Sequence, residues 1–190
     1  MRLILASASP RRLDLLARIG VNPDAVIPAD VDESVPRGEL PRDHALRLAR
    51  EKAEAVARQE PDALVLAADT VVAVGRRILP KVEDEATLRA CMRLLSGRRH
   101  RVLTGVALAI PGAGTRDRLV ETMIAMKRLS DEEIEYYTGH GEWRGKAGGY
   151  ALQGYGEVYV RHIAGSYSNV VGLPLAETRA LLKSAGYDIA

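Results

Sequence analysis

The sequence predicts an α/β protein built on a mixed β-sheet. Apolar runs of strand length alternate with amphipathic runs of helical period along the 190 residues, and one pair of strands flanks a hairpin-type turn. The hairpin requires an antiparallel pair within the sheet. No internal repeat, low-complexity tract or long linker interrupts this pattern, so we expect one domain over residues 1–190.

The first strand and helix are predicted close to the N-terminus. Residues 3–6 are apolar and suit a short buried strand. Ser9 is expected to cap the following helix, Pro10 suits its first position, and the helix continues to about residue 19. Gly20 then provides a stop signal.

The next segments predict a strand over residues 24–27, an acidic loop over 30–34 and a helix over 41–59. The helix has one stripe of mostly small apolar residues, in which Lys52 is the exception. That stripe consists of Ala45, Ala49, Lys52 and Val56.

The central segment is the most apolar part of the chain. Residues 63–68 suit a strand covered on both faces, and Asp69-Thr70 leads from it into a second apolar run over 71–74. A turn is expected at 75–77. The remaining elements are predicted as a helix over 84–95, hairpin strands over 101–110 and 119–129, a short helix over 130–137, a glycine-rich loop over 145–156, a strand over 158–163 and a helix over 174–184.

Composition limits the partners of the protein. Lys and Arg number 27 and Asp and Glu number 25, which leaves a net charge of +2, too small and too evenly spread to indicate a nucleic-acid-binding surface. No apolar run approaches the length of a membrane span or a signal-peptide core. Cys91, the one cysteine, excludes an internal disulfide and is expected to be buried and unreactive. We therefore expect a cytoplasmic protein.

Two hydroxyls and two guanidinium groups gather in Ser7-Ala8-Ser9-Pro10-Arg11-Arg12, where a strand ends and a helix begins. A helix N-terminus carries partial positive charge, so each arginine there is unfavourable by about 0.3–1 kcal/mol unless an anion offsets it. A polyphosphate would offset both. The alternative is a well-capped helix whose arginines point into solvent.

Asp69 and Thr70 are polar residues set between apolar runs. An ionised carboxylate in such surroundings is costly unless it is paired, hydrogen-bonded or bound to a metal. If Asp69 lies at the carboxyl end of a strand, where open α/β sheets bind ligands, it can hold a cation or orient a water molecule. The alternative is an aspartate that begins a turn between two strands.

The roles of Lys52, Lys81 and Glu33 depend on their surroundings. Lys52 either extends from its apolar stripe to solvent or binds a phosphate near the strand ends. Lys81, directly after Pro80, has the same two interpretations. Glu33 is either a solvated loop residue or a metal ligand.

Residues 146–154 are rich in glycine and include Gln153. Such a loop lets a flat base approach the backbone, and the Gln153 amide offers both a donor and an acceptor to a pyrimidine edge. A glycine-rich loop alone is weak support for a site. The histidines lack metal-ligand spacing, and the sequence lacks the motifs of P-loop ATPases, zinc proteases and α/β-hydrolases.

Together these motifs resemble the Maf family of nucleoside triphosphate pyrophosphatases over essentially the whole chain. Residues 7–12 resemble its opening signature, Ala68-Asp69-Thr70-Val71-Val72 its central one, and Leu95-Ser96-Gly97-Arg98 through His100 a third. Residues 146–154 and 165–174 are similar to the branch that acts on dTTP and UTP. The chain lacks the Ser-Phe and Glu that the 7-methyl-GTP branch carries there.

The resemblance implies an elongated, two-lobed fold of the Maf and ITPase type, with a twisted mixed sheet, helices packed around it and a cleft between the lobes. It also implies a divalent cation (Mg²⁺ or Mn²⁺), a nucleoside triphosphate substrate and, often, a homodimer. The roles it implies are Asp69 as proton acceptor, Arg11, Thr70 and Gln153 as the residues that set base choice, Ser7, Arg12, Lys52 and Lys81 as phosphate ligands, and Glu33 with Asp69 as metal contacts.

From these observations we expect a house-cleaning enzyme that hydrolyses dTTP and UTP to the monophosphate and pyrophosphate. Modified pyrimidine triphosphates are further candidate substrates. The alternative is a nucleotide-binding regulator of cell division and septum formation without turnover, which would share the cationic cleft but would not need Asp69.

Overall fold

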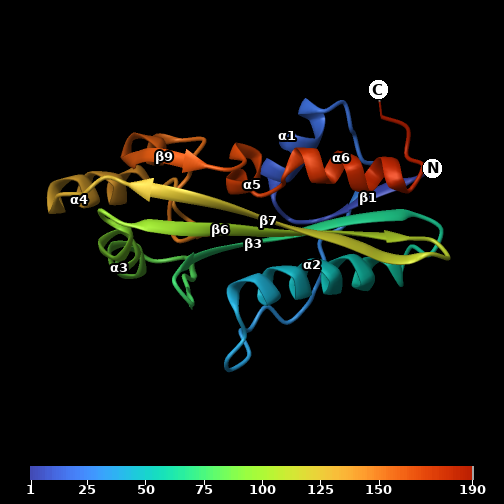
Figure 1. Ribbon diagram of the computed structural model, residues 1–190, viewed down its shortest axis with the longest axis horizontal. Helices are drawn as coiled ribbons and strands as arrows, with labels where there is room; N and C mark the ends of the chain where they lie inside the picture. Colours follow the sequence, from blue (N-terminus) through green and yellow to red (C-terminus); the bar gives the residue numbers. More distant parts are fainter. Residues whose placement is uncertain (190) are drawn as a thin grey trace.

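A long, twisted mixed sheet forms the centre of the fold (Figure 1). The computed structural model describes residues 1–189. The strand order is β2-β1-β3-β6-β7-β9, and β4 pairs with the far part of β3. β1 is parallel to β2 and β3, whereas the other pairs are antiparallel. The strands of this sheet are β1 Leu3–Ala6, β2 Ala25–Val26, β3 Leu64–Val74, β4 Arg77–Ile78, β6 Arg99–Ile110, β7 Gly114–Met126 and β9 Val160–Ala164, while β5 Lys81–Val82 and β8 Lys146–Ala147 form a separate pair.

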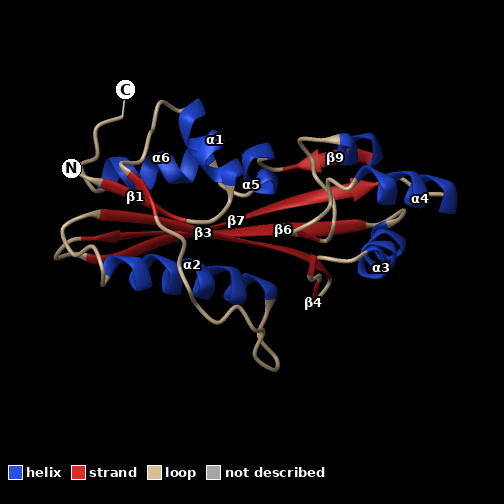
Figure 2. Cartoon of the chain, turned by 180° about the vertical axis from the view of Figure 1, so that it is seen from behind, coloured by secondary structure: helices blue, strands red, loops and turns tan. Residues whose placement is uncertain are grey.

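Helices cover both faces of the sheet (Figures 1 and 2). α2 lies along one face, and α1 and α6 lie on the other face near the termini, with α5 between them and β9, while α3 and α4 lie at the opposite end. Gly105 of β6 permits the close approach of α2, because a Cβ at this position would lie 2.3 Å from the carbonyl oxygen of Ala45. The helices are α1 Pro10–Arg18, α2 Pro41–Ala57, α3 Glu85–Leu95, α4 Asp131–His140, α5 Tyr167–Val171 and α6 Leu175–Ser184, and Tyr155–Tyr159 forms a 3₁₀ turn.

Separate apolar cores lie at the two ends of the sheet. Leu16 and Leu181, from α1 and α6, pack with Leu66 of β3 in one core. Trp143 packs in the other core with residues of α3 and α4, and Cys91 is buried there as expected. Because the long strands connect both cores, the two-lobed α/β architecture expected from the sequence is confirmed.

Some local predictions were wrong. The side chain of Ser9 does not cap α1; its backbone N–H instead bonds the Ser7 hydroxyl. The second hairpin strand begins at Gly114, because the polar residues 115–118 pair with β6 despite their composition. Residues 155–159 form a 3₁₀ turn before β9, so that strand begins later than expected, and α5 was not predicted.

Asp69 lies inside a strand rather than at its end. β3 runs unbroken through Asp69 and Thr70, which pair with Gly105 and Thr104 of β6. Both expectations for Asp69, the carboxyl end of its own strand and a turn, were therefore wrong. The neighbouring strand β1 does end here, because its last residue, Ala6, pairs with Ala67.

Candidate active site

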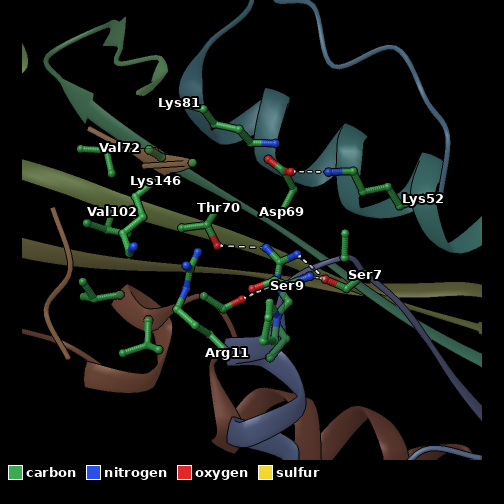
Figure 3. A pocket seen from close by; sticks show the side chains of 18 of the residues that line it. Ser7, Ser9, Arg11, Lys52, Asp69, Thr70, Val72, Lys81, Val102 and Lys146 are labelled. Atoms are coloured by element: carbon green, nitrogen blue, oxygen red, sulfur yellow. Dashed lines mark hydrogen bonds and ion pairs between the residues drawn. The ribbon is translucent and has the colours of Figure 1, made fainter. Parts of the chain in front are cut away.

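A cavity of about 340 Å³ opens beside β3, where β1 has ended (Figure 3). A cavity of this volume is at the small end of the range for ligand pockets. Every residue that the sequence analysis assigned to the site lines it. These residues are Ser7, Arg11, Arg12, Glu33, Lys52, Asp69, Thr70, Lys81 and Gln153.

The cavity extends around a free edge of β3. Within residues 1–189, β1 covers this edge only as far as Ala67, and β4 covers it again from Ala73. Successive side chains along a strand point to opposite faces of the sheet, so the side chains of Asp69 and Thr70 lie on opposite faces. Asp69 lies on the face of α2, whose Lys52 it contacts, and Thr70 lies on the face of α1 and α5. One ligand at this edge can therefore contact both faces.

On the α2 face, four side chains form what we call the carboxylate–lysine cluster: Glu33, Lys52, Asp69 and Lys81. The Lys52 Nζ lies 2.6 Å from Asp69 Oδ1 and 2.6 Å from Glu33 Oε1, and Lys81 donates to the other Glu33 oxygen. Burial alone would raise the pKa of Glu33, but the hydrogen bonds from Lys52 and Lys81 outweigh it and lower the pKa to about 2. Lys52 is thus buried and paired rather than extended to solvent.

On the other face, Arg12 is fixed by three hydrogen bonds. Its guanidinium donates to the Gly172 carbonyl at 2.8 Å, to Ser7 Oγ at 3.0 Å and to Thr70 Oγ1 at 3.4 Å. Burial lowers the pKa of Arg12. The negative charge of Asp69 raises this pKa in part, and the positive charge of neighbouring Arg11 lowers it further. A partly desolvated pair of arginines is suited to bind an anion.

Lys146 is a cation of this cavity that the sequence analysis did not assign a role. It lies in β8, lines the cavity near Thr70 and Arg11 (Figure 3), and its ammonium group donates to the Glu142 carbonyl. Burial lowers its pKa, and the positive charge of Arg11 adds to that effect. Its place within the glycine-rich segment gave only a weak signal, because the pairing between β5 and β8, which brings it to the cavity, is not visible in the sequence.

The remaining wall of the cavity is mostly apolar. Val72 and Val102, which face each other on β3 and β6, form its floor, and Tyr150 contributes to its side. Gln153 also lines the cavity, with an exposed side chain. An apolar floor with an amide at its margin suits a flat heterocycle.

The hydroxyl group of Tyr150 is hydrogen-bonded to His100, the histidine of the third motif. The His100 Nε2 lies 2.7 Å from the Tyr150 hydroxyl, and both side chains are buried. Burial lowers the pKa of His100 to about 4. His100 is therefore neutral at pH 7.

We predict that His100 makes the fold less stable under mildly acidic conditions. An unfolded His100, with its pKa near 6.5, binds a proton below that pH, whereas the folded one resists protonation until about pH 4. Lowering the pH from 7 to 5 should therefore cost about 2 kcal/mol of unfolding free energy. Urea unfolding at both pH values should show this loss in the wild type. In His100→Gln the loss should be smaller by about 2 kcal/mol. An equal loss in both proteins would show that His100 is not its cause.

A metal-binding side-chain cluster and a membrane-spanning helix are both absent from the described residues. Among residues 1–189, no group of three or more His, Cys, Asp or Glu side chains is arranged to hold a metal ion. Over the same range, no helix has the length and apolar character needed to cross a membrane.

Comparison with known proteins gives consistent similarities. The model of the family described as Maf-like protein matches residues 2–185. The chain is 61% identical over 187 residues to a dTTP/UTP pyrophosphatase of Novosphingobium aromaticivorans, covering 98% of this chain and 93% of that protein. It is also 61% identical over 185 residues to the dTTP/UTP pyrophosphatase of Caulobacter vibrioides, covering 97% and 96%. The solved structure of a HAM1 protein from Coxiella burnetii has a TM-score of 0.53 at 15% identity, with 97% of this chain and 100% of that chain covered, which is a likeness of fold alone.

Proposed function

The chain belongs to the family of Maf-like proteins, and from this premise we propose that it is a nucleoside triphosphate pyrophosphatase acting on dTTP and UTP. The reaction releases the nucleoside monophosphate and pyrophosphate. One observation carries the proposal: Asp69, five cationic side chains and an apolar floor border the same cavity at the free edge of β3. Relatives named dTTP/UTP pyrophosphatase, which match nearly the full chain, support it.

In the proposed mechanism Asp69 accepts a proton from the attacking water. Lys52 holds Asp69 Oδ1, so we assign the proton to Oδ2. The water oxygen bonds to the α-phosphorus as the bond between that phosphorus and the α,β-bridging oxygen breaks, and pyrophosphate leaves. Burial of the carboxylate beside a fixed ammonium group keeps it oriented toward the cavity.

Cationic side chains would hold the triphosphate on either side of the β3 edge. Arg12, fixed by its hydrogen bonds to Ser7 and Thr70, can bind phosphate oxygens without reorganising. The ammonium groups of Lys52 and Lys81 already donate to carboxylates, so they would bind phosphate oxygens through their remaining N–H groups. Phosphoryl transfer depends mainly on such positioning and charge stabilisation.

The residues present also fit a divalent cation. Glu33 and Asp69 converge on Lys52, and two carboxylates completed by substrate phosphates and water form the usual oxygen ligand set of Mg²⁺. We propose that these two residues hold Mg²⁺ or Mn²⁺ together with the triphosphate. When bound, the ion would neutralise negative charge on the phosphate oxygens.

We predict that UTP and dTTP are hydrolysed in preference to CTP. Uracil and thymine present the same acceptor–donor–acceptor edge, which the Gln153 amide can match, whereas cytosine exchanges the donor and one acceptor. The expected ratio of kcat/KM for UTP over CTP is about tenfold or more. A panel of nucleoside triphosphates with Mg²⁺, assayed for released pyrophosphate, measures it.

The same panel tests the proposed function. Release of pyrophosphate, rather than orthophosphate, from UTP and dTTP is the expected result. Binding of these nucleotides without turnover would contradict the enzymatic proposal and favour a regulatory protein. Equal cleavage of all common triphosphates would contradict only the base preference.

A further inference from the structure

A chain of hydrogen bonds leads from the interior of the sheet to Thr70 in the cavity wall. Thr104 of β6, which is fully buried, lies directly opposite Thr70, and their hydroxyl oxygens are 3.0 Å apart. The Thr104 oxygen also lies 3.0 Å from the backbone carbonyl oxygen of Asn169. This chain connects the cavity to α5.

The chemistry of the groups fixes the direction of each bond. A carbonyl oxygen only accepts, so Thr104 must donate its single hydroxyl hydrogen to Asn169. Thr70 must then donate its own hydrogen to Thr104. A guanidinium only donates, so the bond from Arg12 occupies one lone pair of Thr70. The Thr70 hydroxyl therefore has no hydrogen left for a ligand.

The acceptor at the end of this chain is itself held firmly. The buried Asn169 side chain donates to the Val102 carbonyl at 3.0 Å and to Thr122 Oγ1 at 2.9 Å. These bonds fix the first turn of α5 to both β6 and β7. The Asn169 carbonyl thus stays in position for Thr104.

Thr70 borders the apolar floor where the base would lie. Thr70 and Val72 point to the same face of β3, and each pairs across the sheet with a residue of β6, Thr104 and Val102 respectively. All of these except Thr104 line the cavity. A base resting on Val72 and Val102 would have its edge beside the Thr70 hydroxyl.

From this arrangement, and resting on the function proposed above, we infer that Thr104 is a positioning residue that makes Thr70 an obligatory acceptor for the pyrimidine edge. Uracil and thymine carry N3–H, a donor that matches the free lone pair of Thr70. Cytosine N3 is itself an acceptor, so it would be repelled by that lone pair. Selection against cytosine, to which the Gln153 amide contributes in the proposed function, is thereby also determined by a buried residue that does not touch the substrate.

Thr104→Val tests the inference, because it keeps the shape of the side chain and removes the acceptor for Thr70. The Thr70 hydroxyl can then rotate and donate to cytosine N3. The ratio of kcat/KM for UTP over CTP should fall roughly tenfold, the size expected for one hydrogen bond. Thr104→Ser, which keeps the hydroxyl, should retain the wild-type ratio.

A double variant separates this role from general damage to the fold. Thr70→Val should lower the UTP to CTP ratio by itself, and adding Thr104→Val should lower it no further, because both changes act on the same hydroxyl. Since the ratio is internal to each protein, partial unfolding does not change it. An unchanged ratio in Thr104→Val, or additive losses in the double variant, would overturn the inference. Absence of UTP hydrolysis by the wild type would instead contradict the proposed function.

Discussion

Replacing Asp69 with asparagine is expected to lower kcat for UTP and dTTP by about 10² to 10⁴-fold, the usual contribution of a general base. The amide has nearly the same shape as the carboxylate but cannot accept a proton from water. It also cannot contribute a charged ligand to a cation, so the loss should lie in the upper part of that range. Steady-state rates of pyrophosphate release measure the effect.

The fold should tolerate this change. Lys52 keeps its bond to Glu33 when Asp69 is replaced, so the buried ammonium group is not left without a carboxylate. Binding of a non-hydrolysable UTP analogue should weaken much less than kcat falls. Asp131→Asn, a change at an exposed position on α4, is the matched control and should leave the rate unchanged. Near-normal turnover by Asp69→Asn would remove the general-base role.

The sequence predicted the composition of the site better than its geometry. The motif at residues 7–12 could be placed at a strand-to-helix junction because Pro10, at the first helical position after an apolar run, is a strong local helix-start signal. Asp69 stood out because a carboxylate between apolar runs requires a partner. That partner, Lys52, was recognisable only as a charged residue in an apolar stripe, since their pairing depends on how α2 crosses β3.

What the sequence could not provide was strand register. Asp69 was expected at a strand end, and it lies instead beyond the end of its neighbour β1, a relation that only pairing defines. The bond between Thr104 and Thr70 depends on register between strands separated by a long stretch of chain. Lys146 reaches the cavity through a two-residue strand too short to produce a periodic signal. Long-range pairing therefore decides which residues of the motifs face one another.

Replacing Lys52 with methionine is the prediction with the largest expected effect on stability. Methionine matches the length of the aliphatic stem but leaves the buried Asp69 and the partly exposed Glu33 without the ammonium group between them. Removing one partner of a buried ion pair costs about 3–5 kcal/mol, and the partial exposure of Glu33 places the expected loss near the lower figure. Urea unfolding without divalent cations measures it, and Lys183→Met on the exposed surface of α6 should change stability by less than about 0.5 kcal/mol.

Mg²⁺ should restore part of the stability lost in Lys52→Met. With the ammonium group gone, the two carboxylates form a more negative oxygen site, and a cation that binds only the folded state stabilises it by about 2.7 kcal/mol at a hundred times its Kd. The gain in melting temperature on adding Mg²⁺ should therefore be larger in Lys52→Met than in the wild type. Adding Asp69→Asn to the variant removes one of the two carboxylates and should abolish the difference. If Mg²⁺ stabilises neither protein, or stabilises the double variant as much as Lys52→Met, then Glu33 and Asp69 do not form the cation site.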